Sequence, residues 1–181
     1  MATTKHTIVA LVEDKPGALN RIASLFRRRG FNIESITVGH SEIPHLSRVT
    51  IVVDGATTMV EQVRKQLDKV IDVVRVSDIT GDDITARELA LIKVKATSAT
   101  RSEIMQIVDI FRANIVDVAS DSLTVEVTGD EQKVDSLLNL LRGFGIRELA
   151  RTGRIAMPRG SLNPLRVEKE STKTRTKKQK Q

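Results

Sequence analysis

Two neighbouring stretches decide how the chain begins to fold: Val12-Glu13-Asp14-Lys15-Pro16-Gly17-Ala18-Leu19 and Arg29-Gly30-Phe31-Asn32-Ile33-Glu34-Ser35. The first stretch predicts the end of a strand, a tight turn and a helix that begins at Pro16-Gly17. Gly30 predicts the end of this helix, because glycine is a common residue just past a helix C-terminus. A second strand is expected to open at Asn32-Ile33. The chain therefore begins with a strand-helix-strand unit.

The turn at Gly17 has complementary charge for both ends of a free amino acid. The backbone amides of Gly17, Ala18 and Leu19 lie at a helix start, where unpaired N–H groups and the helix dipole attract a carboxylate. The carboxylate of Asp14 can hold an ammonium group. A simpler explanation is that Asp14 only caps the helix and Gly17 only shapes the turn. The pattern favours a sensor of small molecules over a catalyst.

Four segments of the sequence have the apolar periodicity of helices. Their apolar positions run from Leu19 to Phe26, from Val60 to Val70, from Ile104 to Phe111 and from Val134 to Leu141. The pairs Thr58/Glu61 and Thr100/Glu103 are spaced as capping boxes, and Gly129-Asp130 precedes the fourth helix. Strands are predicted near residues 6–12, 33–39, 47–53, 71–78, 88–96, 115–119, 122–128 and 146–156.

The order of these elements is β-α-β-β-α-β, twice. This order predicts an α+β fold with two ferredoxin-like βαββαβ domains in tandem. We expect residues 1–80 to form the first domain, 81–86 a linker and 87–160 the second domain. Residues 161–181 are expected to form a basic, disordered tail.

Several predicted strands are apolar on both faces, although helices are expected to cover only one face of each sheet. The clearest examples are Ile8 to Val12 and Val49 to Val53. Burying the second face requires another layer, and we expect a homodimer formed through the first domain. The alternative is that the second domain covers this face within a monomer.

The positive charge of the chain is concentrated near its C-terminus. The net charge is +6, and residues 166–181 hold seven Lys/Arg and two Glu. We therefore do not expect the folded body, which is nearly neutral, to bind nucleic acid. The sequence has no Cys, which excludes disulfides and thiolate catalysis. It begins without an apolar signal segment and has no run long enough to span a bilayer, so we expect a cytoplasmic protein without membrane contact.

The motifs in these stretches resemble those of the regulatory small subunit of acetohydroxyacid synthase (acetolactate synthase), a family with an ACT domain. The resemblance starts with the two stretches quoted first and covers residues 3–160. Its later motifs are Ser47 to Val52, Arg87 to Val94, Phe111 to Val118 and Gly145 to Glu148. The first motif is typical of ACT domains in general, whereas the later ones narrow the resemblance to this family.

The resemblance implies a regulatory subunit without a catalytic site or a metal. Its expected partner is the catalytic large subunit, which holds thiamine diphosphate, Mg²⁺ and FAD and condenses two pyruvates to 2-acetolactate. The small subunit is expected to raise that activity and to confer feedback inhibition by valine. By the same resemblance, valine lies between two ACT domains of a dimer, and its expected contacts are Asp14, Gly17, Ala18, Leu19 and, from the other copy, Asn32 and Ile33.

Two other classes of protein stay open on the sequence alone. An amino-acid-responsive transcription regulator would need a helix-turn-helix, and none is visible between the predicted strands. An enzyme with this fold would need a clustered acid–base set, and the sequence shows none. The three histidines, His6, His40 and His45, do not have the spacing of metal ligands.

Overall fold

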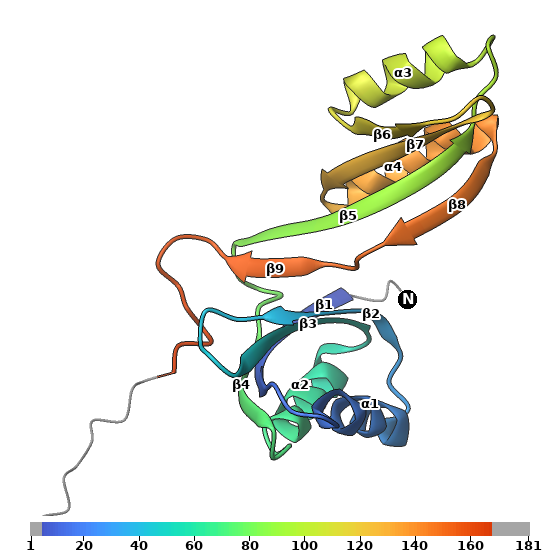
Figure 1. Cartoon of the computed structure of the whole chain (residues 1–181). Helices are drawn as coiled ribbons and strands as arrows, with labels where there is room; N and C mark the ends of the chain where they lie inside the picture. Colours follow the sequence, from blue (N-terminus) through green and yellow to red (C-terminus); the bar gives the residue numbers. More distant parts are fainter. Residues whose placement is uncertain (1–4, 168–181) are drawn as a thin grey trace, which may run out of the picture.

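The computed structural model describes residues 5–167, apart from the side chains of Thr57 and Met59. It forms two units, each an antiparallel sheet with two helices on one face (Figure 1). The predicted fold class is confirmed. The first unit consists of β1 (Lys5–Glu13), α1 (Ala18–Arg29), β2 (Ile33–His40), β3 (Leu46–Asp54), α2 (Thr57–Leu67) and β4 (Val73–Asp78).

The second unit repeats this order and adds a short ninth strand. It consists of β5 (Ile84–Lys95), α3 (Arg101–Ile110), β6 (Asn114–Val118), β7 (Ser122–Gly129), α4 (Glu131–Leu141), a 3-10 turn (Arg142–Phe144), β8 (Ile146–Arg151) and β9 (Ile155–Pro158). The strand orders are β2-β3-β1-β4 and β6-β7-β5-β8, so β2 and β6 occupy equivalent edges. The strand β9 pairs with the first residues of β5.

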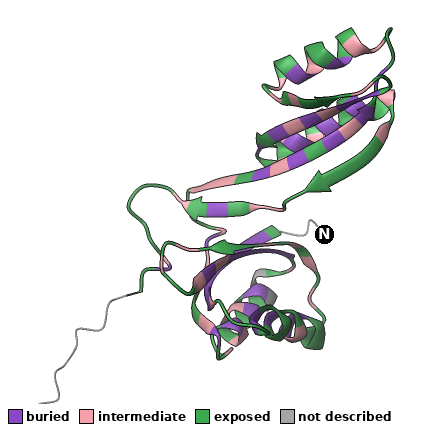
Figure 2. Cartoon of the chain, in the orientation of Figure 1, coloured by how far each residue is buried: buried purple, intermediate pink, exposed green. Residues whose placement is uncertain are grey.

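Each unit has its own apolar core between its helices and its sheet (Figure 2). In the first unit, Ile22 and Phe26 of α1 pack on alternate residues of β1 and β3 such as Ile8 and Ile51. In the second unit, Ile104 and Leu137 face Ile92 of β5 in the same way. Helical spacing on one element and alternation on the other therefore meet in one buried layer.

A third core joins the two units and changes the interpretation of the doubly apolar strand β1. Val9 and Leu11 lie on the face of β1 away from the helices, and both are buried under Ala156 of β9 and Leu165. Figure 1 shows β9 crossing this side of the first sheet. The chain therefore covers this face itself, as the monomer alternative required. The expectation that β1 needs a second subunit for burial is wrong.

The same core moves two of the boundaries expected from the sequence. Ile84 and Ala86, expected in the linker 81–86, belong to β5 because they pack beside Leu11 and pair with β9. The expected tail over 161–181 packs at its start, since Leu165 is 3% exposed and Arg75 Nε donates to the carbonyl of Pro164 at 3.1 Å. The rest of that tail, from residue 168, lies outside the described residues.

The helix starts follow the sequence only in part. Asp130 caps α4, because its Oδ1 accepts from the amide of Lys133 at 2.9 Å. The capping box at Thr58 is wrong, since α2 begins earlier with Ala56 as its N-cap. Thr100 does precede α3, but its hydroxyl accepts from the amide of Thr97 at 3.0 Å instead of from the helix.

Replacing Asp130 with alanine is expected to destabilise the chain by about 0.5–2 kcal/mol, because an amide at the start of α4 loses its acceptor. Thr58→Ala is the matched control, and it should change the free energy of unfolding by less than about 0.5 kcal/mol. Urea unfolding followed by circular dichroism measures both values. A larger loss of unfolding free energy from Thr58→Ala would support the capping box predicted from the sequence.

Candidate functional site

The turn before α1 leaves open space at Gly17. Gly17 is the N-cap of α1 and has a φ of 89°, a left-handed conformation that glycine adopts without strain. A Cβ built on this residue would have no heavy atom within 4 Å. The turn is fixed by backbone bonds on both sides, from Asp14 N to His45 O at 2.9 Å and from Arg21 N to Gly17 O at 3.0 Å. The conformation therefore exposes the helix start instead of covering it.

The amides at this helix start are partly free to bind an anion. Ala18 N donates to Lys15 O at a long 3.3 Å. Among the described residues, the amides of Gly17 and Leu19 have no hydrogen-bond acceptor. The first turn of α1 contains no acidic side chain to neutralise the positive end of the dipole. Open amides and an uncompensated helix dipole are features that favour a negative charge at this end of α1.

The carboxylate of Asp14 does not cap α1, because the N-cap is Gly17 and no side-chain hydrogen bond caps this helix start. The simpler explanation for Asp14 is therefore wrong. Its Oδ2 lies 3.4 Å from Nδ1 of His40, and the side chain is half exposed. Asp14 is thus available to a cationic group that approaches the turn, and Leu19, which is 47% exposed, offers apolar surface beside it.

The other two predicted contacts lie at the opposite end of α1. Asn32 is exposed in the segment before β2, while Ile33 is half buried against the first core. The helix between Gly17 and this segment has 12 residues and is therefore about 18 Å long. One chain does not bring the two groups of residues together. A site made of both needs a second copy of the chain.

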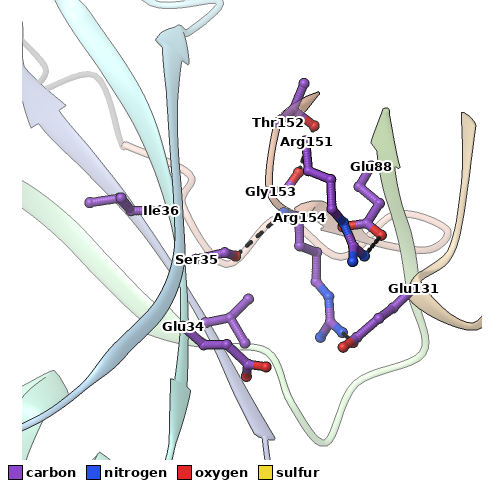
Figure 3. Close-up of a pocket in the computed structure, with 10 residues that line it drawn as sticks. Glu34, Ser35, Ile36, Glu88, Glu131, Arg151, Thr152, Gly153 and Arg154 are labelled. Atoms are coloured by element: carbon purple, nitrogen blue, oxygen red, sulfur yellow. Dashed lines mark hydrogen bonds and ion pairs between the residues drawn. The ribbon is translucent and has the colours of Figure 1, made fainter. Parts of the chain in front are cut away.

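A cluster of charged residues that the sequence did not indicate lies between the two units (Figure 3). It surrounds a cavity of about 380 Å³. The cavity is lined by Glu34, Ser35, Ile36 and Val52 of the first sheet and by Glu88, Glu131, Arg151, Thr152, Gly153 and Arg154 of the second unit. The only local signal for it was Gly153, since a glycine inside a predicted strand often marks a close approach of backbone.

Ion pairs cross this cavity. Lys5 Nζ contacts Glu131 and lies 2.6 Å from Oε1 of Glu34. Arg154 contacts Glu131 Oε2 at 2.6 Å and donates to the hydroxyl of Thr7 at 3.0 Å. The hydrogen bond from Lys5 holds the pKa of the Glu131 carboxyl below its usual 4.5. The hydrogen bonds to Glu131 and Glu34 raise the pKa of the Lys5 ammonium above its usual 10.5.

The lowered pKa of Glu131 predicts an acid-sensitive contact between the units. Its stabilising contribution is present above the unfolded pKa of 4.5 and is lost as the pH falls through the lower folded value. Glu131→Gln should therefore lower the melting temperature by about 1–3 °C near pH 7, and by much less near pH 3. Thermal unfolding at both pH values measures this difference.

Glu126→Gln is the control for this variant. Within residues 5–167, the Glu126 carboxylate takes part in no ion pair. It accepts only a long hydrogen bond of 3.4 Å from the side-chain amide of Asn114. Its replacement should therefore leave the melting temperature nearly unchanged at both pH values. An equal loss from the two variants at pH 7 would contradict a specific role of Glu131 between the units.

Within residues 5–167, no three His, Asp or Glu side chains gather as they would around a metal ion. In the same part of the chain, none of the helices combines the length and the apolar character needed to cross a bilayer.

Both units match known protein families. A profile described as the small subunit of acetolactate synthase matches residues 87–160, and one described as an AHAS small subunit-like ACT domain matches residues 8–75. The probable acetolactate synthase small subunit of Archaeoglobus fulgidus is 58% identical over 157 residues, which are 87% of this chain and 98% of the relative.

Two further relatives agree. The acetolactate synthase small subunit of Mycobacterium bovis is 49% identical over 160 residues, 88% of this chain and 95% of its own. The crystal structure of the acetolactate synthase small subunit from Thermotoga maritima superposes with a TM-score of 0.81 at 43% identity, and the match covers 88% of this chain and 99% of that one. This chain therefore belongs to the acetolactate synthase small-subunit family.

Proposed function

We propose that this chain activates the catalytic large subunit of acetolactate synthase and makes that enzyme sensitive to feedback inhibition by valine. The support is its similarity to acetolactate synthase small subunits over nearly their whole length. In this proposal the chain works in the cytoplasm and contributes no catalytic residue. Thiamine diphosphate, Mg²⁺ and FAD belong to the large subunit, which condenses two pyruvates to 2-acetolactate.

The observation that carries the valine site is the open helix start at Gly17. The valine carboxylate would bind the amides of Gly17, Ala18 and Leu19, where the dipole of α1 favours a negative charge. The valine ammonium group would bind the half-exposed carboxylate of Asp14. Both ends of the ligand are then held by groups within one turn.

A second copy of the chain would complete this site with Asn32 and Ile33. Asn32 offers both a donor and an acceptor, and Ile33 offers apolar surface to a branched side chain. The edge strand β2 supports such a dimer, because an exposed strand edge is a template for pairing with another chain. Its Ile36 and Val38 are 40% and 41% exposed.

Inhibition requires that valine bind one state of the complex more tightly than another. A site split between two copies suits this role, because occupancy changes how the two first units pack. A ratio of about 5- to 150-fold between the two affinities is typical of such coupling, and the large subunit should alter valine affinity by the same factor.

Calorimetric titration of the purified chain with L-valine tests the proposal, with leucine, isoleucine and serine as comparison ligands. The titration is repeated on the chain assembled with its large subunit, together with an assay of acetolactate formation. Saturable valine binding and valine-dependent loss of activity in the complex are expected. Binding of none of these ligands in either form, or an activity that valine does not change, would contradict the proposal.

A further inference from the structure

The connection between β8 and β9 touches β2. It consists of Thr152, Gly153 and Arg154, and Figure 3 shows it beside Ser35 of β2. Thr37 Oγ1 donates to the carbonyl of Thr152 at 3.2 Å, and Arg154 N donates to Ser35 Oγ at 3.4 Å. We call these three residues the 152–154 turn.

The turn approaches β2 so closely that a side chain at its centre would be tightly crowded. A Cβ built on Gly153 would lie 3.0 Å from Thr37 Oγ1 and 3.2 Å from the Cβ of Ser35. Gly153 also has a φ of 83°, in the left-handed region. An added methyl group would therefore require Thr37 or Ser35 to shift by a few tenths of an ångström, in addition to the strain of the left-handed backbone.

Hydrogen bonds and an ion pair also hold the 152–154 turn to the rest of the second unit. Thr152 N donates to the carbonyl of Leu89 at 3.0 Å, and Leu89 N donates to Thr152 Oγ1 at 3.1 Å. Arg154 pairs with Glu131 at the first position of α4. A displacement of the turn is thus passed directly to β5 and to α4.

The contact with the first unit is polar and local by comparison. It involves Ser35 and Thr37 of β2 and, through Arg154, the hydroxyl of Thr7 on β1. Glu34 also takes part, since it shares Lys5 with Glu131 across the cavity. The β2 residues among these follow Ile33 along the strand, and Asn32 comes directly before it, so Ser35 and Thr37 lie about 7 and 13 Å beyond Ile33. The strand that carries half of the proposed valine site is therefore the strand that holds the 152–154 turn.

We propose that the contact of the 152–154 turn with β2 transmits valine occupancy to the second unit. The inference rests on the proposed valine site. Occupancy fixes the start of β2 against the other copy, and the change in its position is carried by Ser35 and Thr37 to the turn. The turn then biases the second unit between two arrangements, since packed elements move between discrete positions rather than deforming continuously. Valine binding and valine inhibition are therefore separable by mutation.

Gly153→Ala tests this separation, and Gly160→Ala is its matched control. Gly160 has a similar φ of 68°, but a Cβ there would have no heavy atom within 4 Å. Both variants carry the same kind of backbone strain, and only the first crowds β2. Calorimetry of the chain measures valine binding, and the assembled complex reports activation and inhibition.

The expected result is that Gly153→Ala binds valine within about 2-fold of the unmodified chain and still activates, whereas the valine concentration for half-inhibition rises about 5-fold or more. Gly160→Ala should keep normal inhibition. Full inhibition of the Gly153→Ala complex would overturn the inference, and so would an equal loss in the two variants, because strain alone would then explain it.

A second variant keeps the test valid if Gly153→Ala does not fold. Thr37→Val removes the hydroxyl that donates to Thr152 and keeps the shape of the side chain, so the valine concentration for half-inhibition should rise while binding persists. Unchanged inhibition would overturn the inference. Failure of the unmodified chain to bind valine at all would overturn the valine site itself, and with it this coupling.

Discussion

Replacing Gly17 with aspartate is expected to abolish valine binding while the chain still activates the large subunit. The new carboxylate would stand where the ligand carboxylate binds, and its negative charge would occupy the positive end of the α1 dipole. Two like charges about 4 Å apart repel by about 4 kcal/mol near a protein surface. We therefore expect the dissociation constant for valine to rise at least about 100-fold.

Two control variants separate charge from shape and from backbone strain. Gly17→Asn adds nearly the same volume without a charge, and asparagine also tolerates the left-handed conformation. It should weaken valine binding less than Gly17→Asp does. Gly160→Asp places the same residue at a left-handed glycine far from this turn in sequence, with open space around its Cβ, and should leave valine binding unchanged. Equal valine affinity for Gly17→Asp and the unmodified chain would place the effector elsewhere.

Replacing Val38 with lysine is expected to separate the proposed dimer and to remove valine binding with it. Val38 lies on the edge strand β2 and is 41% exposed in the single chain. Loss of a buried valine costs about 1.5–3 kcal/mol, and a two-fold interface contains the residue twice. The dissociation constant of the dimer should therefore rise at least about 100-fold. Analytical ultracentrifugation over a range of protein concentrations measures it.

The same sheet provides the control for this variant. Val74 lies on β4, the opposite edge strand, and its exposure of 42% is nearly the same. Val74→Lys should therefore leave both the dimer and valine binding unchanged. If Val74→Lys dissociated the dimer and Val38→Lys did not, the two copies would pair through β4. The valine site could then not combine Gly17 of one copy with Asn32 of the other across β2.

The repeated βαββαβ order could be predicted because its signals are local. Apolar spacing of three and four residues in α1, and alternation in β7, are properties of short segments that fold against their nearest neighbours. Gly30 ends α1 as expected, with a left-handed φ of 69°. The capping box at Thr58 failed because two polar residues at the right spacing do not determine where α2 starts.

In the candidate site, too, features made of adjacent residues could be predicted from the sequence, and features made of distant residues could not. The turn at Gly17 was visible in the sequence, since its glycine, its helix start and Asp14 are adjacent in the chain. The 152–154 turn was not visible, because Gly153 contacts Ser35 and Thr37, which lie far from it in the sequence. The charged cluster around Glu131 was missed for the same reason, as Lys5 and Arg154 come from opposite ends of the described chain.

The sequence by itself determined the two α+β units and the open helix start, together with the family resemblance that the comparisons confirmed. Only the tertiary structure decided what covers the second face of β1, where the linker ends and how the two units touch. The physical reason is that an apolar face specifies that it must be buried but not by what. Val9 and Leu11 required a cover, and the pairing of β9 with β5 placed Ala156 over them in the same chain.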